Sequence, residues 1–314
     1  MPRPSPMTKP LPLQAGDVVR VVAPASPFQA EDLNAGVQVL ESWGYRVRMR
    51  DDIADRELYL AGAPERRAAE LHEAWADEEA RAVLPVRGGY GLTTVLPLLD
   101  PNLFRDHPKV IVGCSDLTAL LQWVVSSAET TCFHGPMVGS LGRGSDEAGT
   151  TQLRALLAGE LGRQELTSQL PDAYQWCVAP GTARGRAVGG SLSLLAATCG
   201  TPYQLDTTGA VLFLEDVGER PYRVDRMLTQ LEQCGLFDGA EAVVFGDFVN
   251  CDEPDGAIGF RDAIDRVFRR IPVPVLMGLP FGHGSPNMAF PLGIKVDVDA
   301  GEGTVRFRES GLGT

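Results

Sequence analysis

The sequence lacks long apolar runs, has few basic residues and contains no closely spaced cysteine pairs. Because no apolar stretch is long enough for a transmembrane segment or a signal peptide, we expect a cytoplasmic protein without membrane contact. The 28 Lys and Arg face 41 Asp and Glu, a net charge of -13, which argues against nucleic acid as a partner because phosphate binding needs clustered cations. The six cysteines form no C-x-x-C pair or metal-ligand spacing, so we predict reduced, mostly buried thiols. We expect no metal and no cofactor.

The composition that remains is that of a globular protein with a large core. Hydrophobic residues make up 44% of the 314 residues and charged residues 22%, and a chain of this length usually forms two domains. We expect a flexible leader over residues 1–14, an N-terminal domain over 15–162 and a C-terminal domain over 183–314. The polar span 163–182 is predicted to be the linker between them.

Predicted strands and helices alternate along both halves of the chain. The β-branched run at residues 17–24 predicts a first strand, and apolar residues at helical spacing follow over 33–43. In the second half, apolar runs at 210–217 and 242–248 predict buried strands, and a terminal hairpin is expected over 294–307. This alternation is typical of an α/β fold with parallel strands.

The stretch from Val110 to Leu117 is the most informative part of the chain. Three β-branched residues are followed by Gly113-Cys114-Ser115-Asp116 and then by apolar residues at helical spacing, which predicts a strand, a tight turn and a helix. Ser115 would then project from the turn, where the first N–H groups of the helix favour negative charge, as in a nucleophile elbow. The alternative is that Ser115 only caps the helix.

A second turn, Arg87-Gly88-Gly89-Tyr90-Gly91, follows another predicted strand. Its glycines would let the backbone approach a ligand, and its N–H groups could bind an oxyanion. The alternative is a flexible turn before a helix over residues 92–99. Because ligands bind at the carboxyl ends of parallel strands, both turns are expected at one edge of the sheet.

The second half supplies the other groups that acyl-transfer chemistry requires. Glu215 and Asp216 end a predicted strand, and His283 lies in a loop rich in glycine and proline. A serine needs a base to take its proton, and a carboxylate orients the imidazole of that base. Of the two acids we favour Glu215, whose longer side chain can reach a histidine on a loop. Asp216 would then serve the turn or a neighbouring Arg. A structural role stays open for Glu215 and His283, and His134, beside Gly-Pro, is expected to be structural.

Six segments that include these residues resemble, in the same order, the serine LD-carboxypeptidases of murein recycling, a family that also includes the microcin C self-immunity peptidases. The resemblance extends from about residue 15 to the C-terminus. The segments are Val86-Arg87-Gly88-Gly89-Tyr90-Gly91, Gly113-Cys114-Ser115-Asp116, Phe133-His134-Gly135-Pro136, Gly189-Gly190-Ser191-Leu192-Ser193, Leu214-Glu215-Asp216-Val217-Gly218-Glu219 and Leu279-Pro280-Phe281-Gly282-His283-Gly284.

The resemblance implies a role for each group. Ser115 would be the nucleophile, His283 the general base and then acid, and Glu215 the carboxylate that orients it. Backbone N–H groups near Asp116 and in the Gly88-Gly89 turn would form the oxyanion hole.

The resemblance also implies a fold and a reaction. The N-terminal domain would be Rossmann-like and carry the serine, the C-terminal α/β domain would supply Glu and His across a cleft, and the protein would form a homodimer. The reaction would be metal-free hydrolysis of the bond between the L-centre of a diamino acid and D-alanine in a murein tetrapeptide. Ser191 departs from the Asn of many relatives, and the segment after Glu215 is closer to the murein branch. Arg87 is left unassigned as a ligand for the terminal carboxylate.

Four other interpretations remain. A peptidyl-nucleotide amide hydrolase of the microcin type would use the same triad, whereas a non-catalytic two-lobed binding protein would need no triad. A cysteine hydrolase based on Cys114 is disfavoured because a residue next to the tip of the turn points toward the core. A dehydrogenase is disfavoured because Gly88-Gly89-Tyr90-Gly91 lacks the dinucleotide fingerprint.

Overall fold

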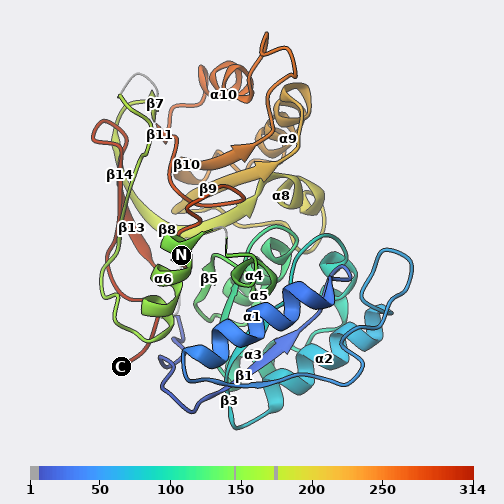
Figure 1. Ribbon diagram of the computed structural model, residues 1–314. Helices are drawn as coiled ribbons and strands as arrows, with labels where there is room; N and C mark the ends of the chain where they lie inside the picture. The colour runs from blue at the N-terminus through green and yellow to red at the C-terminus, as the bar shows by residue number, and fades with distance from the viewer. Residues whose placement is uncertain (1–6, 145, 173–175) are drawn as a thin grey trace. The chain divides into compact units, whose positions relative to one another are not determined.

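The computed structural model describes residues 7–144, 146–172 and 176–314, which fold as two compact units (Figure 1). Unit 1 comprises the described residues up to Gly162 together with two later segments, Met288–Gly293 and Ser310–Thr314. Unit 2 comprises Arg163–Asn287 and Ile294–Glu309. The chain therefore enters unit 2 twice, and each time it returns to unit 1, first at Met288–Gly293 and then at Ser310–Thr314.

Unit 1 is built on a sheet with the strand order β12-β5-β4-β3-β1-β2. The strands from β1 to β5 are all parallel, and β12 is added antiparallel to β5 at one edge. This is the doubly wound arrangement, so the α/β prediction with a parallel sheet is confirmed. The strands are β1 (Val18–Val22), β2 (Arg46–Arg48), β3 (Ala80–Pro85), β4 (Val110–Gly113), β5 (Cys132–His134) and β12 (Phe290–Leu292).

Helices cover both faces of the unit 1 sheet. On one face, an apolar cluster joins α1, α5 and α6 to alternate residues of β1, β3 and β4. Three other helices, α2, α3 and α4, are joined by aromatic rings. Phe104 of α3 stacks on Trp75 of α2 with a centroid distance of 4.1 Å and meets Trp123 of α4 edge-on at 4.9 Å. The helices are α1 (Ala30–Ser42), α2 (Pro64–Ala76), α3 (Pro101–Asp106), α4 (Leu117–Ser127), α5 (Val138–Leu141) and α6 (Glu147–Leu157).

Unit 2 is a second, mixed sheet with the order β6-β14-β13-β8-β9-β10-β11-β7. Its centre, from β8 to β11, is parallel, and the strands on both sides of that centre are antiparallel. The predicted terminal hairpin is confirmed as β13 and β14. The strands are β6 (Glu165–Thr167), β7 (Cys177–Ala179), β8 (Thr182–Ser191), β9 (Ala210–Val217), β10 (Ala240–Val249), β11 (Val275–Leu276), β13 (Lys295–Asp299) and β14 (Thr304–Phe307).

The helices of unit 2 gather near its parallel strands. Figure 1 shows α8 (Leu192–Thr198), α9 (Pro221–Gln233) and α10 (Phe260–Phe268) beside β9 and β10. The β13–β14 hairpin lies farther along the same sheet, beyond β8. No helix in the described part of the chain has the length and apolarity needed to cross a membrane.

The expected leader and linker both contain ordered structure. Within the leader, residues 1–6 lie outside the described residues, but Thr8 forms a β-bridge with Thr130 and Leu13 is buried in the core of unit 1. In the linker, where 173–175 lie outside the described residues, β6 and β7 form the two edges of the unit 2 sheet. Each edge strand is only three residues long, so its sequence lacks the apolar run of a longer buried strand.

The helix expected over residues 92–99 is instead two short 3-10 helices. They span Leu92–Thr94 and Leu96–Leu98. Pro97 has no N–H to continue an α-helical hydrogen-bond ladder, and its ring crowds the preceding turn, so a single α-helix cannot form here.

Candidate active site

Ser115 lies on the turn between β4 and α4, as the strand-turn-helix pattern predicts. It has a φ of 61° and is one of the few non-glycine residues in the left-handed region. The turn is tight: a Cβ on Gly113 would lie 2.7 Å from the Cβ of Leu117, so only glycine fits before the serine. Backbone strain of this kind costs about 1 kcal/mol or more and occurs often at functional sites.

The Gly88 turn packs directly against Ser115. A Cβ on Gly88 would lie 3.1 Å from the Oγ of Ser115 and 3.1 Å from the backbone nitrogen of Asp116. The two glycine-containing turns therefore meet at the carboxyl edge of the unit 1 sheet, as expected. An oxyanion formed at Ser115 could be bound by N–H groups of both turns.

Two buried charged side chains hold the Gly88 turn in place. The carboxylate of Asp116 accepts a hydrogen bond from the backbone N–H of Leu92 at 2.9 Å, and burial raises the pKa of Asp116. Arg67, fully buried on α2, donates to the carbonyl oxygens of Gly91 at 2.8 Å and Pro24 at 3.0 Å. Sequence reasoning missed Arg67, which the helical pattern gives no reason to bury.

Glu215 and His283 form a hydrogen-bonded pair in unit 2. The Nδ1 of His283 lies 2.6 Å from Oε2 of Glu215, which is fully buried, whereas the His283 side chain is 24% exposed. Gly282 permits this approach, because a Cβ there would lie 2.8 Å from the same carboxylate oxygen, and its φ is 121°. Because Nδ1 is engaged by Glu215, Nε2 is the ring nitrogen of His283 that can serve a second partner.

The carboxylates around His283 determine its charge. Burial opposes a protonated ring, but the hydrogen bond and charge of Glu215, with the charges of Asp216 and Asp247, raise the pKa of His283. Asp216 holds the turn into α8: it accepts from the Ser193 N–H at 2.7 Å, and burial raises its pKa to about 6. The structural role suggested for Asp216 thus agrees with the structure.

The remaining candidates have other surroundings. His134 is fully buried and stacks on Phe290 with a centroid distance of 5.1 Å, and Cys114 is also buried. Arg87 is exposed and donates to the Pro27 carbonyl oxygen at 3.2 Å. In residues 7–144, 146–172 and 176–314, no cluster of three or more His, Cys, Asp or Glu side chains is arranged to hold a metal ion.

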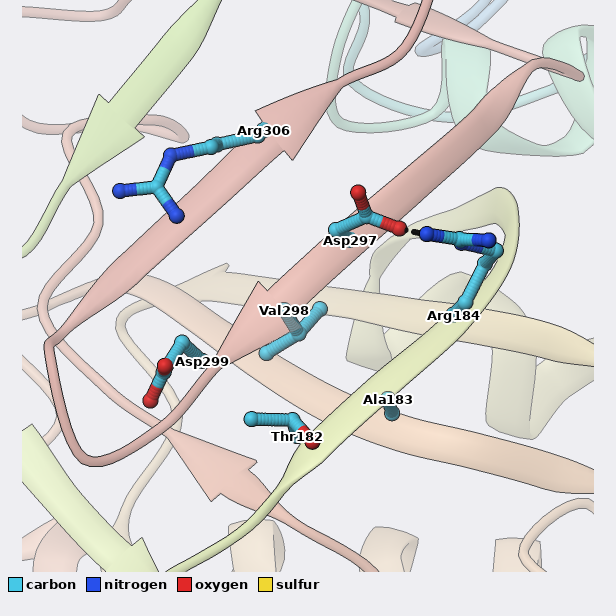
Figure 2. A pocket seen from close by; sticks show the side chains of 7 residues that line it. All are labelled: Thr182, Ala183, Arg184, Asp297, Val298, Asp299 and Arg306. Carbon is cyan, nitrogen blue, oxygen red and sulfur yellow. Dashed lines mark hydrogen bonds and ion pairs between the residues drawn. The ribbon is translucent and has the colours of Figure 1, made fainter.

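A hollow of about 370 Å³ lies elsewhere on unit 2, over β8, β13 and β14. The Nε atom of Arg184 donates to Oδ1 of Asp297 at 2.5 Å. Figure 2 shows this pair, with Arg306 pointing away from it. Ser191 of β8 pairs with Glu215 of β9, and Arg184 lies seven residues before Ser191 in the same strand. Seven residues of a strand span roughly 23 Å. Within this hollow Arg184 is paired with Asp297, whereas Arg306 is paired with Glu165, which does not line it. The hollow is separate from the Glu215–His283 pair.

Comparison with known proteins identifies the family. The LD-carboxypeptidase N-terminal domain model matches residues 19–135, and the LD-carboxypeptidase C-terminal domain model matches residues 184–298. The chain belongs to the LD-carboxypeptidase family. It is accordingly an enzyme, a serine carboxypeptidase, and the resemblance seen in its six sequence segments is confirmed.

Relatives of this LD-carboxypeptidase are similar over nearly their whole length. It is 35% identical to the "Probable murein peptide carboxypeptidase" of Bacillus subtilis (strain 168), covering 94% of this chain and 93% of that protein. The crystal structure of muramoyltetrapeptide carboxypeptidase from Oxalobacter formigenes has a TM-score of 0.82 at 28% identity, covering 95% of this chain and 100% of the other. The structure of MccF in complex with glutamyl sulfamoyl guanosine has a TM-score of 0.87 at 22% identity, covering 98% and 100%, which shows a shared fold.

Proposed function

We propose that this LD-carboxypeptidase removes the terminal D-alanine from murein tetrapeptides, with Ser115, His283 and Glu215 as its catalytic triad. The observation that carries the proposal is the 2.6 Å contact between His283 Nδ1 and a buried carboxylate, because it leaves Nε2 free to act as a base. The murein substrate is supported by the names of the similar proteins from Bacillus subtilis and Oxalobacter formigenes.

The reaction would proceed through an acyl-enzyme. Ser115 Oγ attacks the carbonyl carbon that precedes D-alanine while His283 Nε2 takes the hydroxyl proton. N–H groups of Gly88, Gly89 and Asp116 stabilise the oxyanion, and the protonated His283 then gives its proton to the leaving amine as the C–N bond breaks. Water, deprotonated by His283, hydrolyses the ester and restores Ser115.

Glu215 keeps the base in the correct state throughout. Its buried carboxylate accepts from Nδ1–H, so the neutral ring presents an unprotonated Nε2 to the serine. When Nε2 gains a proton, the same carboxylate stabilises the imidazolium. The proposal further requires that His283 Nε2 come within hydrogen-bonding distance of Ser115 Oγ during the reaction.

The test is D-alanine release from a purified murein tetrapeptide by Ser115→Ala and His283→Ala. We expect kcat/KM to fall by about a thousandfold or more in each variant, because removing one member of a triad disables the others. Ser126→Ala, at the far end of α4, and His107→Ala, at an exposed position, are the matched controls. Near wild-type release by either triad variant would refute the assignment.

Two further measurements separate this function from its alternatives. A microcin-type enzyme would hydrolyse glutamyl sulfamoyl guanosine and leave the tetrapeptide intact. A non-catalytic binding protein would not react with a fluorophosphonate at Ser115. The proposed mechanism uses no metal, so EDTA should leave the rate unchanged.

We also propose a cytoplasmic homodimer, in keeping with the resemblance to this family. Light scattering on the purified protein would give twice the chain mass of 33.7 kDa. A monomer at micromolar concentration would contradict the dimer without affecting the proposed chemistry.

A further inference from the structure

Strand β10 contains a bulge directly opposite Glu215. Leu214 of β9 pairs with Phe245, and Asp216 pairs with Phe248, so Gly246 and Asp247 together oppose the single residue Glu215. A bulge of this kind turns a side chain away from its regular direction and is common beside active sites. Here it places an additional carboxylate, that of Asp247, in the surroundings of His283.

The bulge is bonded to the His283 loop on both sides of the histidine. On the N-terminal side of His283, the carbonyl oxygen of Phe281 accepts a hydrogen bond from the N–H of Asp247 at 2.9 Å. On the C-terminal side of His283, the backbone N–H of Gly284 donates a hydrogen bond to the carboxylate of Asp247. A Cβ at Gly246 would overlap Phe281, and a Cβ at Gly284 would overlap Asp247, so glycine is required at both positions.

The charges of three carboxylates act on the imidazole of His283, and the three have different roles. Glu215 makes the direct hydrogen bond, and Asp216 is occupied by the Ser193 N–H. Asp247 acts on the ring through its charge and on the loop through Gly284. Burial raises the pKa of Asp247 to about 6, so it is ionised above neutral pH, where a neutral histidine acts as a base.

We propose that Asp247 is a positioning residue for His283, which holds the histidine loop through Gly284 and stabilises the imidazolium with its negative charge. The inference rests on the proposed function, in which His283 is the general base. A residue that only satisfied the Gly284 N–H would not need a charge, since a neutral amide oxygen accepts the same bond. Charge and bond can therefore be separated by substitution.

The experiment compares Asp247→Asn and Asp247→Ala with Glu241→Gln, an exposed acid on the same strand. The pKa of His283 is measured by NMR titration of its imidazole in the full-length protein, with the resonance assigned from His283→Gln. We expect Asp247→Asn to lower the pKa of His283 by about one half to one unit, because a nearby negative charge is lost. Glu241→Gln should leave the titration unchanged.

Steady-state kinetics on the tetrapeptide test the second part of the proposal, that Asp247 holds the His283 loop in place. We expect Asp247→Ala to lower kcat by about tenfold or more with KM little changed, because a misplaced base impairs the chemical step rather than binding. An unchanged His283 titration in Asp247→Asn, or a kcat of Asp247→Ala within about twofold of wild type, would overturn the proposal. The titration needs no activity, so its outcome is independent of the proposed function, which the His283→Ala variant tests separately.

Discussion

At the scale of single residues, the proposed triad contains side chains in states that are costly in free energy. Ser115 has a left-handed backbone conformation, and Glu215 is a fully buried carboxylate. The motifs around Ser115, Glu215 and His283 could be found from the sequence because each ends a recognisable strand or occupies a glycine-rich loop. The burial of Arg67 and the position of Asp247 could not be found this way, since neither follows from local apolar spacing.

The strain at Ser115 predicts a separation of stability from activity. Ser115→Gly should be more stable than Ser115→Ala by about 1 kcal/mol, because glycine tolerates a φ of 61° and alanine does not. Both variants should lack activity. Urea unfolding of the two proteins measures the difference, and equal midpoints would show that the turn is not strained.

The raised pKa of His283 predicts the pH dependence of the reaction. In the proposed mechanism the base His283 must be neutral, so kcat/KM should fall as the pH drops through the pKa of His283, which lies above its usual value. In Glu215→Gln this acid limb should move to lower pH and the plateau should fall, because the carboxylate no longer stabilises the imidazolium. Asp297→Asn, on the surface of unit 2, is the control. An acid limb that stays in place would contradict the pairing.

At the scale of elements, the two glycine-containing turns at the edge of the unit 1 sheet form one structure. Their meeting could be expected because parallel strands end on the same side of a sheet. The sequence indicates the bulge in β10 only weakly. Gly246 is a lone glycine inside an apolar strand, and such a glycine often marks a bulge. Its location opposite Glu215 depends on strand register, which a single strand does not specify.

The close approach of the Gly88 turn predicts that this glycine is essential for activity. Gly88→Ala should lower kcat/KM by about a hundredfold or more, because the new methyl group would lie 3.1 Å from Ser115 Oγ and displace the proposed oxyanion donors. Gly162→Ala is a suitable control, since a Cβ there meets nothing within 4 Å. Steady-state kinetics with a thermal melt would distinguish loss of activity from unfolding.

At the scale of the whole molecule, the last part of the chain completes the first unit. β12 pairs with β5, the side chain of Gln152 exchanges two hydrogen bonds with the backbone of Ala289, and Thr131 Oγ1 donates to the Gly311 carbonyl oxygen at 2.6 Å. A division of the chain at residues 163–182 places these segments in the second domain. The contacts that hold them in unit 1 join residues more than 130 positions apart, so local patterns do not reveal them.

This arrangement predicts that a short deletion far from Ser115 in sequence will destabilise unit 1. Removing residues 310–314 eliminates the bond to Thr131, the bond from the Gly313 N–H to the Pro10 carbonyl oxygen and the burial of Leu312. We expect a loss of about 2–4 kcal/mol from these contacts. Calorimetry measures it, and Thr131→Val should account for about 1 kcal/mol. An unchanged melting temperature in the deletion variant would contradict the prediction.

The amino-acid sequence by itself determined the alternation of strands and helices, the turn that carries Ser115 and the order of the six family segments, because each depends on residues close together in the chain. Tertiary structure alone decided that Glu215 meets His283, that a bulge brings Asp247 beside the histidine loop, and that residues 288–293 and 310–314 complete unit 1. The physical reason is the same in each case. Strand register and packing between distant segments arise from the whole core, whereas a local pattern specifies only which face of an element is buried.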